Sequence, residues 1–260
     1  MRLGVCTPGL PMPREEKFTL ARRLGLAGVQ MAPAEVAGAN PEAAAQVREA
    51  ARAHGLGITG TTAGPNLVDP VGLEERIQEF RDFFRLSVAL GSGLVTGEVK
   101  AKPDGLSDEA AWESVLHAVR GVVRLADEQG GVFALEAGPG CWVRTAADVE
   151  RVLTAVAHPR LKVNFDARNH YVAGDDPVEA ARCFAGEIVH AHVNDGVRSG
   201  RDGRWEARPV GAGEMDHAAV LRTLEQLGFN GYLCVEHCRS AAELTSALAH
   251  LRAVYPFAGG

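Results

Sequence analysis

The sequence predicts an α/β fold, a (β/α)8 barrel of eight parallel strands, and three observations favour it. Eight short apolar runs recur along the 260 residues, and most are followed by a segment with apolar residues at helical spacing. Strict alternation of strand and helix implies parallel strands, and eight such units suggest closure into a barrel. The length is typical of one barrel, and no linker or low-complexity tract interrupts the chain. We therefore expect a single domain over residues 1–260.

The predicted strands are short apolar segments, many of them rich in β-branched residues. They span Leu3–Cys6, Gly28–Met31, Leu56–Thr61, Leu94–Glu98, Val132–Glu136, Leu161–Asp166, Ile188–Asn194 and Tyr232–Glu236. The alternative topology is an open doubly wound sheet, which usually carries a glycine-rich turn after its first strand. Residues 4–9, Gly-Val-Cys-Thr-Pro-Gly, do not match that turn, so the barrel is favoured.

The segments between these strands predict amphipathic helices with recognisable ends. One continuous apolar stripe consists of Leu73, Ile77, Phe80 and Phe84. Ser107 and Thr145 each precede a helical segment and suit its N-terminal cap, because their hydroxyls can accept a backbone N–H. A glycine stands where a helix should stop and a strand should begin at four places: Gly55, Gly91, Gly130 and Gly228.

Composition and charge exclude several classes of protein. Hydrophobic residues make up 46% and charged residues 23%, which suits a soluble protein with a large core. A formal net charge of −6 disfavours nucleic acid as a partner, since phosphate binding needs a basic face. No apolar run approaches the roughly 18 residues of a membrane span. The five cysteines lack the spacing of a disulfide framework, and we interpret them as reduced core thiols of a cytoplasmic protein: Cys6, Cys141, Cys183, Cys234 and Cys238.

Side-chain alternation in the last four predicted strands separates two faces. Bulky aliphatic and aromatic residues share one face, which we expect to pack on the helices, so the smaller or polar face points into the barrel. At or near the C-terminal ends of these strands, the inner face carries Glu136, Asp166, His192 and Glu236. Neighbouring strands lie about 4.8 Å apart, so four adjacent strand ends on a curved rim can aim their side chains at one point.

Four such side chains together predict a metal site. Three carboxylates would repel one another and raise each other's pKa unless a cation neutralises them. Carboxylate oxygens with one imidazole nitrogen suit one divalent ion: Mn²⁺, Mg²⁺, Co²⁺ or Zn²⁺. Each residue alone would be an ordinary strand-end polar group, but four in register at the catalytic end of a barrel favour metal binding. His190 lies about 6.6 Å deeper than His192, and we interpret it as a hydrogen-bonded interior residue.

Five motifs also carry a resemblance to a known family. They are Leu-Glu-Ala at residues 135–137, Val-Asn-Phe-Asp-Ala-Arg-Asn at 163–169, His-Ala-His-Val-Asn-Asp at 190–195, Gly-Ala-Gly-Glu-Met-Asp at 211–216 and Gly-Tyr-Leu-Cys-Val-Glu at 231–236. In this combination the chain resembles the xylose-isomerase-like sugar phosphate isomerase/epimerase superfamily of TIM barrels. The resemblance implies that Glu136, Asp166, His192 and Glu236 bind one catalytic metal, and that Glu136 and Glu236 form the acid–base pair.

The expected activity is that of a metal-dependent isomerase or epimerase of a small carbohydrate-like substrate. A metal that bridges a carbonyl and the adjacent hydroxyl acidifies the C–H between them and stabilises an enediolate. A carboxylate on either side can then remove a proton and return it elsewhere, giving isomerisation or epimerisation. Dehydration of a keto-polyol such as an inosose starts with the same step and is the alternative. The formation of a homo-oligomer is left open.

Three positions bear on the substrate. Compared with the ketose 3-epimerases that it resembles, the chain has Trp142 in place of a glutamate and Asn169 in place of a histidine, whereas Arg198 is retained. We therefore expect a smaller or differently functionalised substrate, contacted by these three residues. Trp142 is equally suited to anchoring its loop. Arg198 belongs to a group of loop arginines that suit carboxylate or phosphate recognition, or else a solvated loop or subunit contact: Arg198, Arg201, Arg204 and Arg208.

Two other functions are disfavoured. The apurinic endonucleases share this barrel but need ligands for further metals, including an Asp-x-His after the seventh strand. This chain has no such sequence there, and its net charge is negative. A barrel that binds a ligand without catalysis is disfavoured by the presence of all four candidate metal ligands.

Overall fold

A computed structural model describes residues 1–36, 38, 40–199 and 204–257 of the chain. Eight parallel strands form a closed barrel in which β1 pairs with both β2 and β10. The predicted (β/α)8 barrel is therefore confirmed. Its strands are β1 (Arg2–Cys6), β2 (Gly28–Met31), β3 (Gly57–Ala63), β4 (Leu94–Glu98), β5 (Val132–Glu136), β6 (Leu161–Asp166), β7 (Ile188–Val193) and β10 (Tyr232–Val235).

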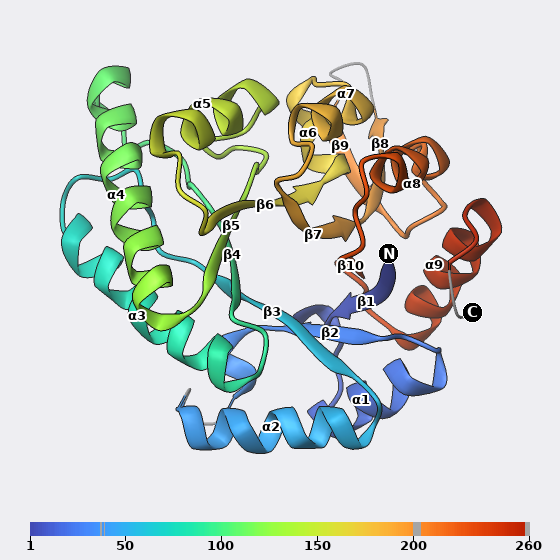
Figure 1. The fold of residues 1–260 in the computed structure, drawn as a ribbon. Helices are drawn as coiled ribbons and strands as arrows, with labels where there is room; N and C mark the ends of the chain where they lie inside the picture. Colours follow the sequence, from blue (N-terminus) through green and yellow to red (C-terminus); the bar gives the residue numbers. More distant parts are fainter. Residues whose placement is uncertain (37, 39, 200–203, 258–260) are drawn as a thin grey trace.

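Helices surround this barrel, and α3 and α4 lie side by side on its outside (Figure 1). Thr145 caps α5 as predicted, with Oγ1 accepting from the Asp148 N–H at 3.2 Å. Gly130 ends α4 with φ of +72°, a conformation that a side chain would strain. The helices are α1 (Arg14–Arg23), α2 (Pro41–Ala53), α3 (Leu73–Ala89), α4 (Asp108–Gln129), α5 (Ala146–Val156), α6 (Ala167–Ala173), α7 (Pro177–Cys183), α8 (His217–Gln226) and α9 (Ala241–Val254), with short 3-10 turns at Thr7–Gly9 and Pro33–Glu35.

One element was absent from the sequence-based prediction. Between β7 and α8, an antiparallel hairpin joins β8 (Asp195–Ser199) to β9 (Arg204–Arg208). The β9 side chains are mostly exposed and charged, so this strand lacks the apolar alternation by which a half-buried strand is recognised. The seventh barrel strand, β7, ends at Val193, one residue earlier than predicted, and Asn194 follows it directly.

The outward faces of the strands pack on the helices, as the alternation predicts. The ring of Phe133 on β5 meets that of Phe80 on α3 edge to face, with centroids 5.5 Å apart. The ring of Phe165 on β6 stacks on His170 at 5.4 Å and lies against Phe184. Each buried side chain of this size contributes roughly 1.5–3 kcal/mol. This packing fixes which residues of β5 and β6 turn inward.

The barrel interior is polar where the inner faces meet. His190 on β7 lies 2.8 Å from Asn164 Oδ1 through Nδ1 and 3.0 Å from Thr59 Oγ1 of β3 through Nε2. All three residues are buried. His190 is thus a hydrogen-bonded interior residue, as expected, and it holds Asn164 in place beneath the strand ends.

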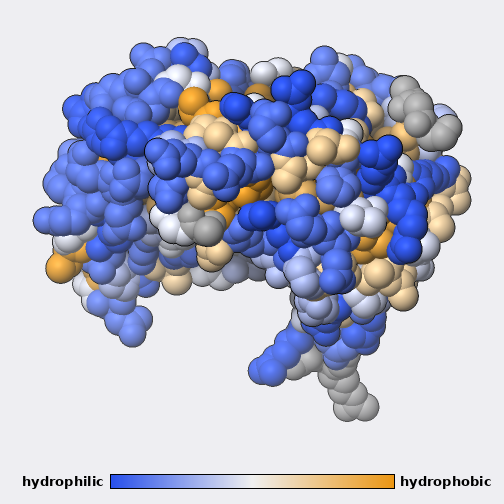
Figure 2. Space-filling model, turned by 90° about the horizontal axis from the view of Figure 1, so that it is seen from below, coloured by the Kyte–Doolittle hydropathy of each residue, from blue (hydrophilic) through white to orange (hydrophobic). Residues whose placement is uncertain are grey.

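Hydrophilic side chains cover most of the face of the molecule shown in Figure 2, with smaller hydrophobic areas between them. Among the described residues, the large hydrophobic side chains that are exposed are Val71 and Val88. No helix in the described part of the chain has both the length and the apolar character needed to cross a membrane.

Candidate metal centre

Four polar side chains gather where the last four strands of the barrel end. Glu136 and Asp166 are the last residues of β5 and β6, His192 is the penultimate residue of β7, and Glu236 directly follows β10. Asp166 stands opposite His192 in the register of β6 and β7. Glu136, Asp166 and His192 are buried, and Glu236 is half-buried.

The imidazole of His192 lies at the centre of this group. Its Nδ1 is 3.3 Å from Glu136 Oε1 and 3.7 Å from Glu236 Oε2. Ligand atoms of Glu136, Asp166 and His192 all lie within 4.8 Å of one another. The structure therefore brings the four predicted ligands together around one imidazole.

Amide side chains hold the carboxylates in orientation. Asn164 and Asn169 donate to the two oxygens of Glu136 at 2.7 and 3.1 Å. The Asn194 amide donates to Asp166 Oδ2 at 2.8 Å and to Glu236 Oε2 at 3.2 Å. Neutral donors of this kind orient a carboxylate without cancelling its charge.

The position of Asp166 follows from the local chain. It ends β6 and is the N-cap of α6, so its Oδ1 accepts the Asn169 backbone N–H at 3.0 Å. The strand orients the side chain inward, and the helix start holds one of its oxygens. The other oxygen remains directed toward Asn194.

The charge of this site is incompletely balanced. Among the described residues, no lysine or arginine forms an ion pair with Glu136, Asp166 or Glu236; the ion-pair partners are His192 and His237. Burial raises the pKa of Glu136 to about 7, although His192 opposes the shift. Burial alone would lower the pKa of His192, but Glu236 and Glu136 outweigh it and raise that pKa well above its ordinary value.

This arrangement fits a bound divalent ion. A proton on His192 supplies positive charge between three carboxylates, and a divalent cation in the same place would supply more. Three carboxylates and one imidazole are donors that suit hard or borderline ions such as Mn²⁺, Mg²⁺, Co²⁺ and Zn²⁺.

A glutamine on the opposite side of the barrel fixes the far nitrogen of His192. Gln30 of β2 presents Oε1 to His192 Nε2 at 2.6 Å, and its own Nε2 donates to Thr96 Oγ1 at 3.0 Å. The thiol of Cys6 also donates to Gln30 Oε1, at 3.0 Å. Nε2 is therefore a donor, and Nδ1 is the nitrogen that faces the carboxylates.

A cavity of about 360 Å³ opens above this centre. Lys100 stands on its wall in an ion pair with Glu98, with Nζ to Oε2 at 2.6 Å. Arg168 donates to Asn194 Oδ1 at 3.1 Å, and no described carboxylate forms an ion pair with it. The charged and amide residues on the wall include Glu98, Lys100, Glu136, Arg168, Asn169, His192, Glu236 and His237.

The xylose isomerase-like TIM barrel family model matches residues 18–254. The chain belongs to this family. It is 20% identical to the inosose dehydratase of Clostridium perfringens over 147 residues, which are 50% of this chain and 48% of that protein. The chain thus spans about half the length of that relative.

Two solved structures share the fold of this family member over nearly its whole length. The D-psicose 3-epimerase of Clostridium cellulolyticum superposes with a TM-score of 0.80 and 18% identity, covering 98% of this chain and 99% of that one. The 3-keto-D-glucoside 4-epimerase of E. coli gives 0.81 and 18%, covering 97% and 99%. The family resemblance expected from the sequence is confirmed.

One of the three predicted substrate residues lies in the cavity wall. Asn169 is 3% exposed and lines the cavity beside Glu136. Its Nδ2 donates to Glu136 and to the Ala137 carbonyl oxygen at 2.9 Å. Its Oδ1 is buried and has no hydrogen-bond partner among the described residues.

The other two predicted substrate residues are not among the described residues of the wall. Trp142 packs on Trp112 of α4 with ring centroids 5.9 Å apart, as a loop anchor would. Arg198 of β8 donates to the Tyr171 carbonyl oxygen at 2.9 Å, and its guanidinium lies over the Tyr171 ring. Of the remaining loop arginines, Arg204 and Arg208 lie exposed on β9, and Arg201 lies outside the described residues.

Sequence reasoning assigned no role to several residues of this site. Arg168 lies in the motif at residues 163–169 and Asn194 in the motif at 190–195. Lys100 lies two residues after the end of β4. Gln30 carried a usable signal, because it is the one strongly polar residue of the short apolar strand β2. A buried polar residue in such a strand needs a partner inside the barrel.

Proposed function

We propose that this protein is a divalent-metal-dependent isomerase or epimerase of a small sugar, sugar acid or related hydroxy-ketone. The observation that carries the proposal is that Glu136 and Glu236 flank the Nδ1 of His192 at 3.3 and 3.7 Å and both line the cavity. Two carboxylates at one centre suit removal of a proton beside a carbonyl and its return to another place.

Glu136, Asp166, His192 and Glu236 would hold the ion. When bound, it supplies polarisation of the substrate carbonyl, which makes the neighbouring C–H acidic. The carboxylates would be orientated for this task before substrate arrives, because Asn164, Asn169 and Asn194 donate to their oxygens.

The two glutamates divide the proton transfer. One takes the proton from the carbon that carries the hydroxyl, and its conjugate acid returns it to the carbonyl carbon while the hydroxyl proton passes to the former carbonyl oxygen, which gives the isomer. If the second glutamate protonates the same carbon from the opposite face, the product is the epimer.

The cavity wall supports a polyhydroxylated substrate. Asn169 lies on this wall, with its Nδ2 donating to Glu136. Arg168 and Lys100 offer N–H donors to a carboxylate or carbonyl oxygen, and a planar guanidinium suits a carboxylate best.

Dehydration of a keto-polyol is the second candidate. The named inosose dehydratase relative favours it. So does His237, which lies 3.1 Å from Glu236 and lines the cavity, because loss of a hydroxyl needs an acid beside the base. A nuclease remains disfavoured by the net charge of −6.

Proton exchange in D₂O tests the proposal. The protein is loaded with Mn²⁺ and incubated with aldoses, ketoses, hydroxypyruvate and inososes, and NMR and mass spectrometry follow deuterium at each carbon. An isomerase or epimerase yields a labelled isomer of unchanged composition, whereas a dehydratase yields a product lighter by one water. No exchange and no loss of water with any substrate would contradict both candidates.

Variants assign the exchange to this centre. Glu136→Gln and Glu236→Gln should each lower the exchange rate by about 10²–10⁴-fold, since each removes an acid–base group. Glu74→Gln, the same substitution on the exposed face of α3 beside His117, serves as the matched control and should leave the rate unchanged.

A further inference from the structure

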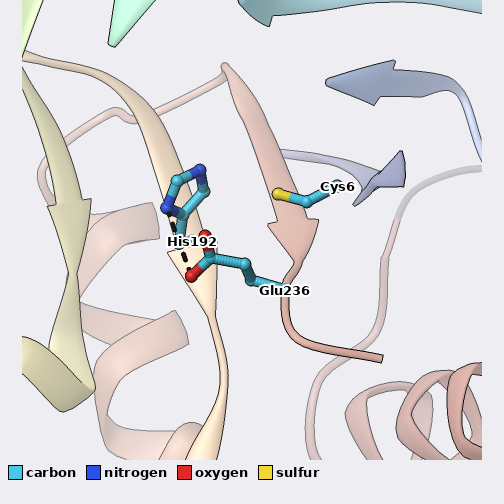
Figure 3. A group of neighbouring side chains, drawn as sticks. All are labelled: Cys6, His192 and Glu236. Carbon is cyan, nitrogen blue, oxygen red and sulfur yellow. Dashed lines mark ion pairs between the residues drawn. The ribbon is translucent and has the colours of Figure 1, made fainter. Parts of the chain in front are cut away.

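A cysteine from the first strand lies beside the candidate metal centre. Cys6 is the last residue of β1, and β1 pairs with β10, the strand that Glu236 follows. Figure 3 shows the side chains of Cys6, His192 and Glu236 pointing toward one another from three strand ends. One potential ligand atom from each of the three lies within 4.8 Å of the other two.

The sulfur is held there by a specific contact. Cys6 is 6% exposed, forms no disulfide, and donates its S–H to Gln30 Oε1 at 3.0 Å. The same oxygen faces His192 Nε2 at 2.6 Å. Gln30 thus places the thiol beside the imidazole. An aliphatic residue at position 6 would fill the end of β1 but would bring no sulfur to this site.

Cys6, His192 and Glu236 include a sulfur donor, whereas Glu136, Asp166 and His192 offer only oxygen and nitrogen donors. Thiolate sulfur is a soft ligand, which Zn²⁺ and Co²⁺ accept and Mg²⁺ does not favour. His192 belongs to both groups of three, so the Cys6 sulfur and the carboxylate oxygens lie around the same imidazole.

We propose that Cys6 is a further ligand of the metal centre, and that with His192 and Glu236 it directs the site toward a thiophilic ion such as Zn²⁺ or Co²⁺. This inference rests on the proposed metal dependence. Binding converts the thiol to a thiolate, and the proton leaves to solvent as the metal–sulfur bond forms. Burial raises the pKa of the free Cys6 thiol, so the ion itself must supply the charge that stabilises the thiolate.

Co²⁺ absorption spectra test this ligand directly. The full chain is stripped of metal, reconstituted with Co²⁺ and analysed for bound cobalt. We expect a thiolate-to-cobalt charge-transfer absorption in the near ultraviolet for the wild type. Cys6→Ser should bind Co²⁺ without that absorption. Cys183→Ser is the control, because Cys183 is exposed at the C-terminal end of α7 and should leave the absorption intact.

Metal preference gives a second measurement. Competition of Zn²⁺ against Mn²⁺ should shift toward Mn²⁺ by about 10-fold or more in Cys6→Ser, as expected when a soft donor is lost. Retained Mn²⁺ binding shows that the variant is folded, and Cys6→Ala repeats the test if it is not.

The outcomes separate this inference from the proposed function. If the wild type binds neither Co²⁺ nor Mn²⁺, the metal centre itself fails. Cobalt bound without charge-transfer absorption would overturn only the role of Cys6. The same holds if the absorption persists in Cys6→Ser.

Discussion

Nε2 of His192 lies 2.6 Å from Oε1 of Gln30, a contact that crosses the barrel interior between residues 162 positions apart in sequence. The glutamine accepts a hydrogen bond at this nitrogen and leaves Nδ1 directed at Glu136 and Glu236. A histidine ligand held in this way is orientated before any ion arrives.

Removal of this contact should weaken metal binding. In Gln30→Met the side-chain volume is nearly retained but the acceptor is lost, so His192 can rotate or take the other tautomer. We expect Mn²⁺ affinity, measured by calorimetric titration, to fall about 10- to 100-fold. Gln226→Met, the same change on the exposed end of α8, is the control. Equal affinities in wild type and Gln30→Met would contradict the role of Gln30.

Two arginines compete for the role of substrate contact. Arg168 lines the cavity, whereas Arg198 is engaged with Tyr171. Arg168→Met should raise KM for an active substrate by about 10- to 100-fold, the effect of losing a hydrogen bond from a charged donor worth roughly 1.5–3 kcal/mol. Arg198→Met should change KM little. Steady-state kinetics of both variants measure these KM values. A raised KM in Arg198→Met with an unchanged KM in Arg168→Met would instead support Arg198 as the substrate contact, as the sequence predicts.

Metal removal should lower thermal stability. An ion that binds only the folded protein stabilises it by about 2.7 kcal/mol when its free concentration is 100 times Kd. Chelation should therefore lower Tm, and added Mn²⁺ should restore it. The double variant Glu136→Gln with Glu236→Gln should show no such shift. A metal-dependent Tm that survives in this variant would place the ion elsewhere.

Stability should fall with acidification partly through His170. Burial between Phe165 and Phe184 lowers its pKa below the ordinary 6.5, although Asp175 opposes the shift. The unfolded chain therefore takes up this proton first. The contribution of the neutral imidazole is complete above about pH 6.5 and is lost as pH falls toward the folded-state pKa.

Chemical unfolding of the metal-free protein at several pH values checks this effect. His170→Gln keeps a donor for Asp175 but does not titrate. Between about pH 7.5 and 5.5 the wild type should lose more unfolding free energy than the variant, by up to about 1.4 kcal/mol per pH unit for one proton. Parallel pH profiles would rule out His170 as a source of the acid sensitivity.

The sequence by itself predicted the eight strands of the barrel, its closure, and the gathering of Glu136, Asp166, His192 and Glu236 at its rim. Apolar runs and capping residues are local signals, so β5 and β6 begin and end at the predicted residues. Side chains alternate between the two faces of a strand, so the apolar residues that pack on the helices also identify the residues that point into the barrel. The proximity of Glu136, Asp166 and His192 could therefore be predicted before any distance between them was known.

Only the tertiary structure shows which residues of the first strands contact the site at the ends of the last four strands. Closure of the barrel brings Gln30 of β2 and Cys6 of β1 to His192, and no local pattern encodes that distance. The hairpin after β7 carries Arg198 to Tyr171, while the start of α6 leaves Arg168 on the cavity wall. Periodicity specifies the face of a strand, but contacts across a barrel depend on the register and closure of all eight strands together.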